Sequence, residues 1–161
     1  ADILEGRADE IAALMAREQL GDELVMAGDA ALARMPWSAR PRLVIRRGVP
    51  GPDDRVSVTP VFAGIAETGT LMVHSGPEVA NLLHFLPETH IAVLAAAQIV
   101  GAYEDAWARL RAAVAGTGGV MPRAVTLISG PSRTADIERT PQIGVHGPRK
   151  LHIVVVDGEQ T

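Results

Sequence analysis

A run of small polar residues follows an apolar segment in the last third of the chain. Residues 124–129 have the sequence AVTLIS and lead into a Gly-Pro turn, after which come Ser132, Arg133 and Thr134. Hydroxyl groups, the free N–H groups of a helix start and a guanidinium all favour a negatively charged ligand. Gly130 also lets a ligand approach the backbone closely. The same residues suit a simple helix cap, in which Arg133 pairs with a nearby carboxylate. Both an anion site and a cap remain open here.

A second polar turn lies between two apolar runs. Glu67 is followed by Thr68, Gly69 and Thr70, in the sequence GIAETGTLMVHSG. A carboxylate is costly to bury unless it is paired or takes part in chemistry. We therefore expect Glu67 to be partly buried and hydrogen-bonded near its turn, although an exposed turn residue would have the same spacing.

Metal binding and nucleophilic catalysis have weaker support in the sequence. No two of the five histidines have the helical i, i+4 spacing of metal ligands. The one candidate set of metal ligands is His146 with Asp136 or Glu138. Ser132, His146 and Asp136 are the residue types of a catalytic triad. However, the turn GPSRT lacks the final glycine of a Gly-x-Ser-x-Gly elbow. We expect no metal in this chain and assign no catalytic residue.

Composition excludes several classes of protein. The chain has 161 residues, a net charge of -4 and no cysteine. The acidic balance offers no attraction to nucleic acid, and the lack of cysteine excludes disulfides and thiolate-bound clusters within these residues. No apolar run reaches the roughly 20 residues that span a bilayer. We expect a cytoplasmic protein of one domain, and the start at Ala1 suggests that an N-terminal segment is missing.

Hydrophobic periodicity predicts strands that alternate with helices. Helices are expected at 2–20 with Gly21 as C-cap, after Asp29 as far as Met35, at 78–85, and along the stripe from Ile99 to Val114. Strands are expected at 23–27, 42–46, on both sides of the 67–70 turn, at 90–96 and 124–129, and as a last buried strand at 150–157. This pattern is typical of an α/β fold with a mainly parallel sheet flanked by helices and some antiparallel pairing within 56–74. Ligands of such sheets bind beyond the carboxyl ends of the strands.

Three segments together resemble one family. They are GIAETGTLMVHSG at 64–76, LPETHIAVL at 86–94 and SGPSRTADIERTPQIGVHGPRKLHIVVVD at 129–157. They closely resemble the LUD-domain lactate utilization family, and within it the LutC-type subunits. The resemblance implies a fold of the NagB/RpiA/CoA-transferase-like group, with residues 1–161 as a single LUD domain.

The resemblance also implies a function. LutC-type proteins take part in the oxidation of L-lactate to pyruvate together with iron–sulfur partner subunits, and the absence of cysteine fits a subunit that carries no cluster or other cofactor itself. The resemblance therefore implies an accessory subunit that is non-catalytic or depends on its partners for activity. The alternatives are a stand-alone enzyme acting on a carboxylate, phosphate or CoA-linked substrate, by analogy of fold alone, and a pure interaction module.

We expect the three polar segments to meet in one pocket for a small anion at one edge of the sheet. The predicted ligand-binding residues are Glu67, Thr68, Gly69, Thr70, Gly130, Ser132, Arg133, Thr134, Asp136, His146 and Arg149. Ser132 and Thr134 are expected at a helix start, and the two arginines would bind a carboxylate or phosphate.

Overall fold

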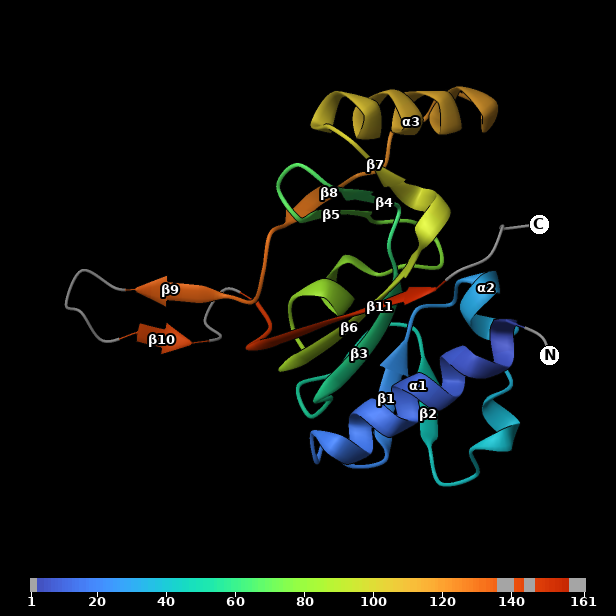
Figure 1. Ribbon diagram of the computed structural model, residues 1–161, viewed down its shortest axis with the longest axis vertical. Coiled ribbons are helices and arrows are strands. Elements are labelled where there is room, and N and C mark those ends of the chain that lie inside the picture. Colours follow the sequence, from blue (N-terminus) through green and yellow to red (C-terminus); the bar gives the residue numbers. More distant parts are fainter. Residues whose placement is uncertain (1–2, 136–140, 144–146, 157–161) are drawn as a thin grey trace.

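Two β-sheets lie face to face between two helices (Figure 1). The computed structural model describes the backbone of residues 3–135, 141–143 and 147–156, and the side chains of residues 8–132 and 147–156. Helix α1 (Ile3–Arg17) covers one sheet and helix α3 (Tyr103–Gly116) covers the other.

The sheet beneath α1 has five strands, and every neighbouring pair in it is parallel. Its order is β11 (Lys150–Val156), β6 (Thr89–Ala95), β3 (Val56–Pro60), β1 (Glu23–Met26) and β2 (Val44–Arg47). The predicted α/β fold with a mainly parallel sheet is therefore confirmed.

The second sheet is mixed. Its order is β7 (Ile99–Val100), β4 (Ala63–Ile65), β5 (Thr70–His74) and β8 (Val125–Ile128). Strands β4 and β5 are antiparallel, which confirms the strand, turn and strand predicted around Glu67. Gly69 has a φ of 63° in the connecting turn, a conformation that glycine adopts without a steric penalty.

Strand β6 shows how one sequence serves two cores. Ile91 and Val93 pack into the cluster beneath α1, whereas Ala92 and Leu94 face the second sheet. Both faces of a strand are covered in this way only when layers lie above and below it, which explains its continuous apolar run. The sheets also approach closely, since a Cβ added at Gly64 would lie 2.8 Å from Leu94 Cδ2.

Helix α1 ends earlier than its sequence suggests. Its last helical residue is Arg17, and Gln19 takes the left-handed conformation with a φ of 55°. The N–H of Leu20 then donates to the carbonyl of Met15 at 2.9 Å, as in a Schellman motif. The residue that terminates the helix in the left-handed conformation is thus Gln19, and the predicted C-cap, Gly21, lies two residues beyond it.

The short helical elements differ from expectation in two places. Asp29 does cap a brief helix, α2 (Ala30–Ala33), and a 3₁₀ turn, η1 (Trp37–Ala39), follows it. The helix predicted at 78–85 is only the 3₁₀ turn η2 (Asn81–His84). Ile99 belongs to β7 instead of the predicted helical stripe, after a further 3₁₀ turn, η3 (Ala96–Gln98). Its pairing with Gly64 of β4 explains the difference.

No helix starts at Ser132 within the described residues. Residues Arg133–Ala135 form β9, which pairs antiparallel with β10 (Pro141–Ile143). The two strands project away from the body of the molecule (Figure 1). Cross-strand pairing thus replaces the predicted helix cap.

Strand β11 is also less buried than predicted. It is the outermost strand of the parallel sheet, next to β6. Ile153 and Val155 are 45% and 52% exposed. The apolar run of its sequence fits a central strand equally well, so periodicity alone could not assign the edge position.

Candidate functional site

Four hydroxyl groups gather where β5 begins and β8 ends. The Oγ1 of Thr70 lies 2.8 Å from the Oγ of Ser129 and 3.1 Å from the phenolic oxygen of Tyr103. Thr68 is 2.8 Å from Thr70 and donates to the Tyr103 oxygen at 3.3 Å. This bond first, and the contact with Thr70 second, lower the pKa of Tyr103 below its ordinary value. The structure therefore brings two of the predicted polar segments into direct contact.

Glu67 lies beside this hydroxyl cluster but is exposed, so the expectation of burial is wrong. Its Oε1 accepts a hydrogen bond of 3.2 Å from the backbone N–H of Tyr103, at the start of α3. Asp105 accepts a second N–H, from Ala102, at 3.2 Å. Two carboxylates thus already satisfy donors of this helix start.

The third predicted segment reaches the same side of the molecule through Ser132. The N–H of Ser132 donates to the carbonyl of Pro148 at 2.9 Å, and a Cβ added at Gly147 would lie 3.5 Å from Ser132 Cβ. Residues 129–132 thereby link the hydroxyl cluster to the turn that precedes β11.

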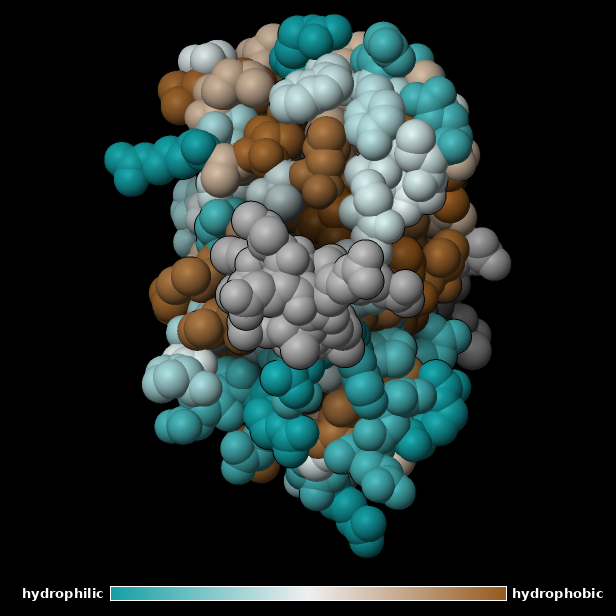
Figure 2. Space-filling view, turned by 90° about the vertical axis from the view of Figure 1, so that its left-hand side faces the viewer, coloured by the Kyte–Doolittle hydropathy of each residue, from teal (hydrophilic) through white to brown (hydrophobic). Residues whose placement is uncertain are grey.

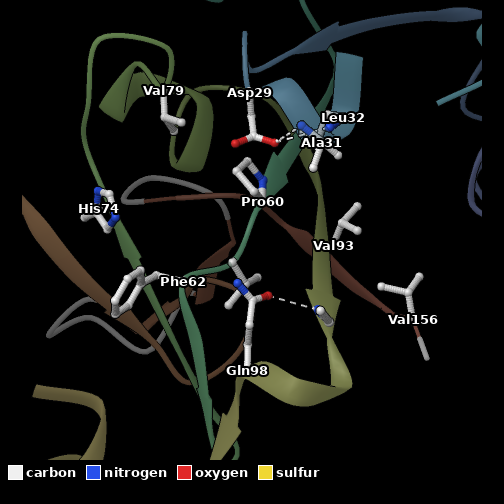
Figure 3. A pocket seen from close by; sticks show the side chains of 12 residues that line it. Asp29, Ala31, Leu32, Pro60, Phe62, His74, Val79, Val93, Gln98 and Val156 are labelled. Carbon is white, nitrogen blue, oxygen red and sulfur yellow. Dashed lines mark hydrogen bonds between the residues drawn. The ribbon is translucent and has the colours of Figure 1, made fainter. Parts of the chain in front are cut away.

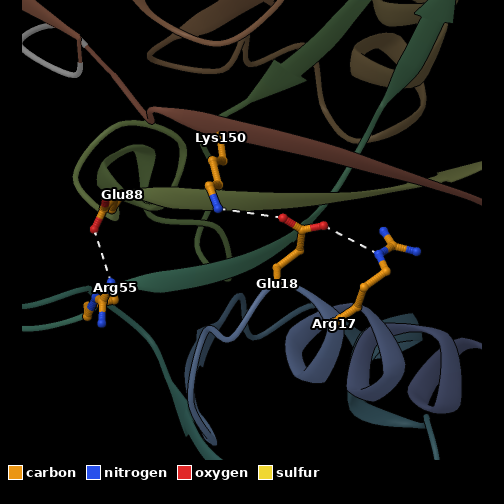
Figure 4. Close-up of polar contacts among 5 residues, drawn as sticks. All are labelled: Arg17, Glu18, Arg55, Glu88 and Lys150. Atoms are coloured by element: carbon orange, nitrogen blue, oxygen red, sulfur yellow. Dashed lines mark hydrogen bonds and ion pairs between the residues drawn. The ribbon is translucent and has the colours of Figure 1, made fainter.

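Arg149 lies at the amino-terminal edge of the parallel sheet, not beyond its carboxyl ends. It pairs with Glu88 at 3.8 Å. Glu88 also pairs with Arg55 at 3.5 Å, as Figure 4 shows. These three residues precede β11, β6 and β3, and they line a polar hollow of about 280 Å³. Figure 4 also shows Lys150 paired with Glu18 of the α1 end, at 3.5 Å.

We call this side of the molecule the amino side. Figure 2 looks onto it and shows hydrophilic residues over its lower part, the end where α1 and β2 lie. Arg133 and Thr134 enter the projecting strand β9 from here, with only their backbone described. Asp136, Glu138 and His146 lie outside the described residues.

A different hollow lies at the carboxyl ends of the parallel strands. Its volume is about 210 Å³, and it is lined by the residues that follow β1, β3 and β6 and by the end of β11 (Figure 3). We call it the carboxyl-edge cavity. Its polar lining comes from Asp29, His74 and Gln98, none of which the sequence identified as a site residue.

The polar groups of the carboxyl-edge cavity are fixed by local hydrogen bonds. Asp29 Oδ1 accepts from the N–H groups of Ala31 and Leu32 at 2.9 and 3.2 Å, while its other oxygen points away from the helix (Figure 3). Gln98 Oε1 accepts from the N–H of Ala95 at 3.1 Å, which turns its amide nitrogen toward the cavity (Figure 3).

His74 closes one wall of the cavity. Its Nδ1 lies 3.1 Å from the Ser75 carbonyl oxygen, and its ring meets Phe62 edge-on at 5.2 Å. When Nδ1 donates this bond, Nε2 is left as an acceptor. The cavity can therefore accept hydrogen bonds through Asp29 and His74 and donate them through Gln98. Its negative carboxylate makes it a poor site for an anion. Asp29, His74 and Gln98 could have been identified from the sequence, because each lies near the end of a strand.

Two histidines, His84 of η2 and His90 of β6, are buried. The rings of His84 and His90 are 5.6 Å apart, and His90 Nε2 lies 2.7 Å from Thr59 Oγ1. Burial, with a smaller contribution from neighbouring histidines, lowers the pKa of His84 to about 4 and that of His90 to about 3. Both rings are neutral at pH 7, and we assign them a structural role.

The described part of the chain contains neither a metal-binding cluster nor a membrane-spanning helix. Among those residues, no group of three or more His, Asp or Glu side chains is arranged to hold a metal ion. The described helices also include none with the length and apolar character needed to cross a membrane.

Fold and site together define a class: an α/β protein with stacked parallel and mixed sheets and polar turns on one side. Residues 55–156 match the family model of the LUD domain, and the chain belongs to the LUD domain family. The resemblance noted in the sequence is therefore confirmed.

Several relatives carry a functional name. The chain is 38% identical over 92 residues to "Lactate utilization protein C" of Geobacillus kaustophilus and 35% identical over 92 residues to that of Bacillus subtilis. Each match covers 57% of this chain and only 38% of the relative.

Longer matches carry no activity in their names. "Uncharacterized protein YkgG" of Escherichia coli K12 is 31% identical over 165 residues, covering 95% of this chain and 71% of that protein. A solved DUF162 family protein from Deinococcus radiodurans superposes with a TM-score of 0.57 at 22% identity. It covers 91% of this chain and 81% of its own, and it supports the fold alone.

Proposed function

We propose that this chain is a LutC-like accessory subunit of a system that oxidises L-lactate to pyruvate. The observation that carries the proposal is the identity of 35–38% over 92 residues to proteins named for lactate utilization, in a chain that matches the LUD domain over residues 55–156. Because that segment is 38% of those proteins, the proposal concerns what this shared domain contributes.

The partners in this proposal are iron–sulfur proteins. Oxidation of lactate releases two electrons, and a chain without cysteine offers no thiolate to hold a cluster that would receive them. The electron carriers would therefore belong to other subunits. Co-purification from the native cell tests this: cysteine-rich iron–sulfur proteins should be recovered with the tagged chain, and recovery of the chain alone would contradict it.

We further propose that the amino side binds a small carboxylate. Ser129 is exposed, and its hydroxyl, which lies 2.8 Å from that of the buried Thr70, can rotate to donate to a ligand oxygen. Ser132 joins them to Arg149, whose planar fork suits a carboxylate. A ligand there would compete with Glu88, which already pairs with Arg149.

Calorimetric titration with L-lactate and pyruvate tests this site. Ser129→Ala and Arg149→Ala should weaken binding, whereas Gln98→Ala in the carboxyl-edge cavity is the matched control and should not. If Gln98→Ala weakens binding and the amino-side variants do not, the ligand occupies the other region. That outcome would remove the binding site from the proposal but leave the subunit role intact.

A further inference from the structure

The two outer strands of the parallel sheet differ in how they face solvent. Strand β2 has four residues, and two of them are Arg46 and Arg47. Arg46 also donates to the carbonyl of Val49 at 2.9 Å and pairs with Asp54. Short length and positive charge are the usual means by which an edge strand avoids pairing with another chain.

Strand β11 has neither protection. It has seven residues, and its one charged side chain, Lys150, stands at the first position. Ile153 and Val155 are 45% and 52% exposed. They share a face with Leu151, which does pack against the second sheet. Among the described residues, β6 is the strand that pairs with β11, and none pairs with its outer side.

We propose that a second copy of this chain adds its own β11 to this edge. The two strands would run antiparallel about a twofold axis, so that two five-stranded sheets become one. Such a contact is self-complementary and closed, which limits it to a dimer. Its backbone hydrogen bonds would use the N–H and C=O groups on the outer side of β11.

The sequence of β11 suits this register. With Ile153 on the twofold axis, Ile153 faces its own copy and Val155 faces Leu151 of the other chain. Lys150 then lies opposite Val156, so no two like charges meet. An in-register parallel pair would instead bring the two Lys150 side chains together. A hollow of about 390 Å³ lies between α1 and β11. It leaves room, beside the contact between the two β11 strands, for the side chains on the α1-facing side of β11.

A single introduced cysteine tests the register, because the chain has none of its own. Directly opposed residues in antiparallel strands have Cα atoms about 4.5–5.5 Å apart, within the range of a disulfide. Ile153→Cys should therefore give a covalent dimer as the main species under mild oxidation. Val44→Cys, on the exposed β2 edge, is the control and should not form the covalent dimer, although its β11 strands still pair. Equal cross-linking of both variants would mean random collision and would overturn the proposal.

Sedimentation velocity tests the dimer without a cross-link. The unmodified chain should sediment at twice the mass of one chain, and Val155→Lys should weaken association about tenfold, since both copies place a charge in the seam. Val44→Lys should leave association unchanged. Circular dichroism would confirm that each variant is folded. A monomer at all concentrations, or a dimer that Val155→Lys does not weaken, contradicts the proposal.

Discussion

The amino side and the carboxyl-edge cavity make opposite use of polar residues. On the amino side, hydroxyls and arginines come from contiguous turns whose composition stands out in the sequence, at 67–70, 129–132 and 147–149. The carboxyl-edge cavity is formed by single residues from separate strand ends, such as Asp29 and Gln98. The difference shows that composition reveals polar residues that cluster in short turns but misses a site whose polar residues come singly from separate strand ends.

The largest expected effect concerns two buried histidines that belong to neither region. His84 and His90 have folded-state pKa values near 4 and 3, below the ordinary value of 6.5. The unfolded chain therefore binds more protons below pH 6.5, and stability should fall as pH falls from 6.5 toward 4, by up to about 1.4 kcal/mol per pH unit for each ring. Urea unfolding at pH 7.5, 6 and 5 measures this.

His84→Leu should flatten that decline, because it removes one of the two titrating rings. His74→Gln leaves both buried rings in place and should keep the slope of the unmodified chain. If His84→Leu declines as steeply as the unmodified chain, carboxylates and not the histidines set the acid limit.

The next largest effect is expected at the arginine of the amino side. Arg149→Ala removes a charged contact to the proposed carboxylate, which should cost about 2 kcal/mol of binding, a factor of roughly 30 in Kd. Titration of the variant with L-lactate measures the change. An unchanged Kd would show that Arg149 does not contact the carboxylate.

A smaller effect is expected at the hydroxyl cluster. Ser129→Ala removes one neutral donor, at about 1 kcal/mol or a factor of roughly 5 in Kd. Ser129 is exposed, so the fold should tolerate the change. A loss of thermal stability comparable to the loss of binding would indicate that the hydroxyl bond to Thr70 is structural.

The smallest effect is expected from the carboxyl-edge cavity. Gln98→Ala should leave the Kd for L-lactate within twofold, because Asp29 gives the cavity a negative charge that disfavours an anion. A tenfold loss in this variant would reverse the comparison between the two regions and assign ligand binding to the strand ends.

The sequence predicted those features that depend on near neighbours. The turn between β4 and β5 and the cap of α2 by Asp29 follow from local patterns. The wrong predictions concern elements whose structure depends on pairing with another strand. The residues of β9 pair with β10 instead of starting a helix, and Ile99 pairs with β4 instead of joining α3. Glu67 accepts a hydrogen bond as expected, but its burial was wrongly predicted, because a turn between buried strands can still face solvent.

The candidate site divides in the same way. The contact between Thr70 and Ser129 agrees with the expectation that their segments converge. The position of Arg149 before β11, at the amino edge, could not be read from a rule that places ligands beyond the carboxyl ends. The two edges could not be distinguished from local patterns, because strand order depends on residues far apart in the chain.

The proposed role of this chain is that of a subunit in lactate oxidation whose electron carriers belong to its partners. The most direct measurement is pyruvate formation from L-lactate by the iron–sulfur partner proteins, with and without the purified chain. We expect turnover only when the chain and its partners are combined, and a colourless, inactive protein when the chain is assayed alone. Turnover by the isolated chain, or full activity of the partners in its absence, would contradict the claim.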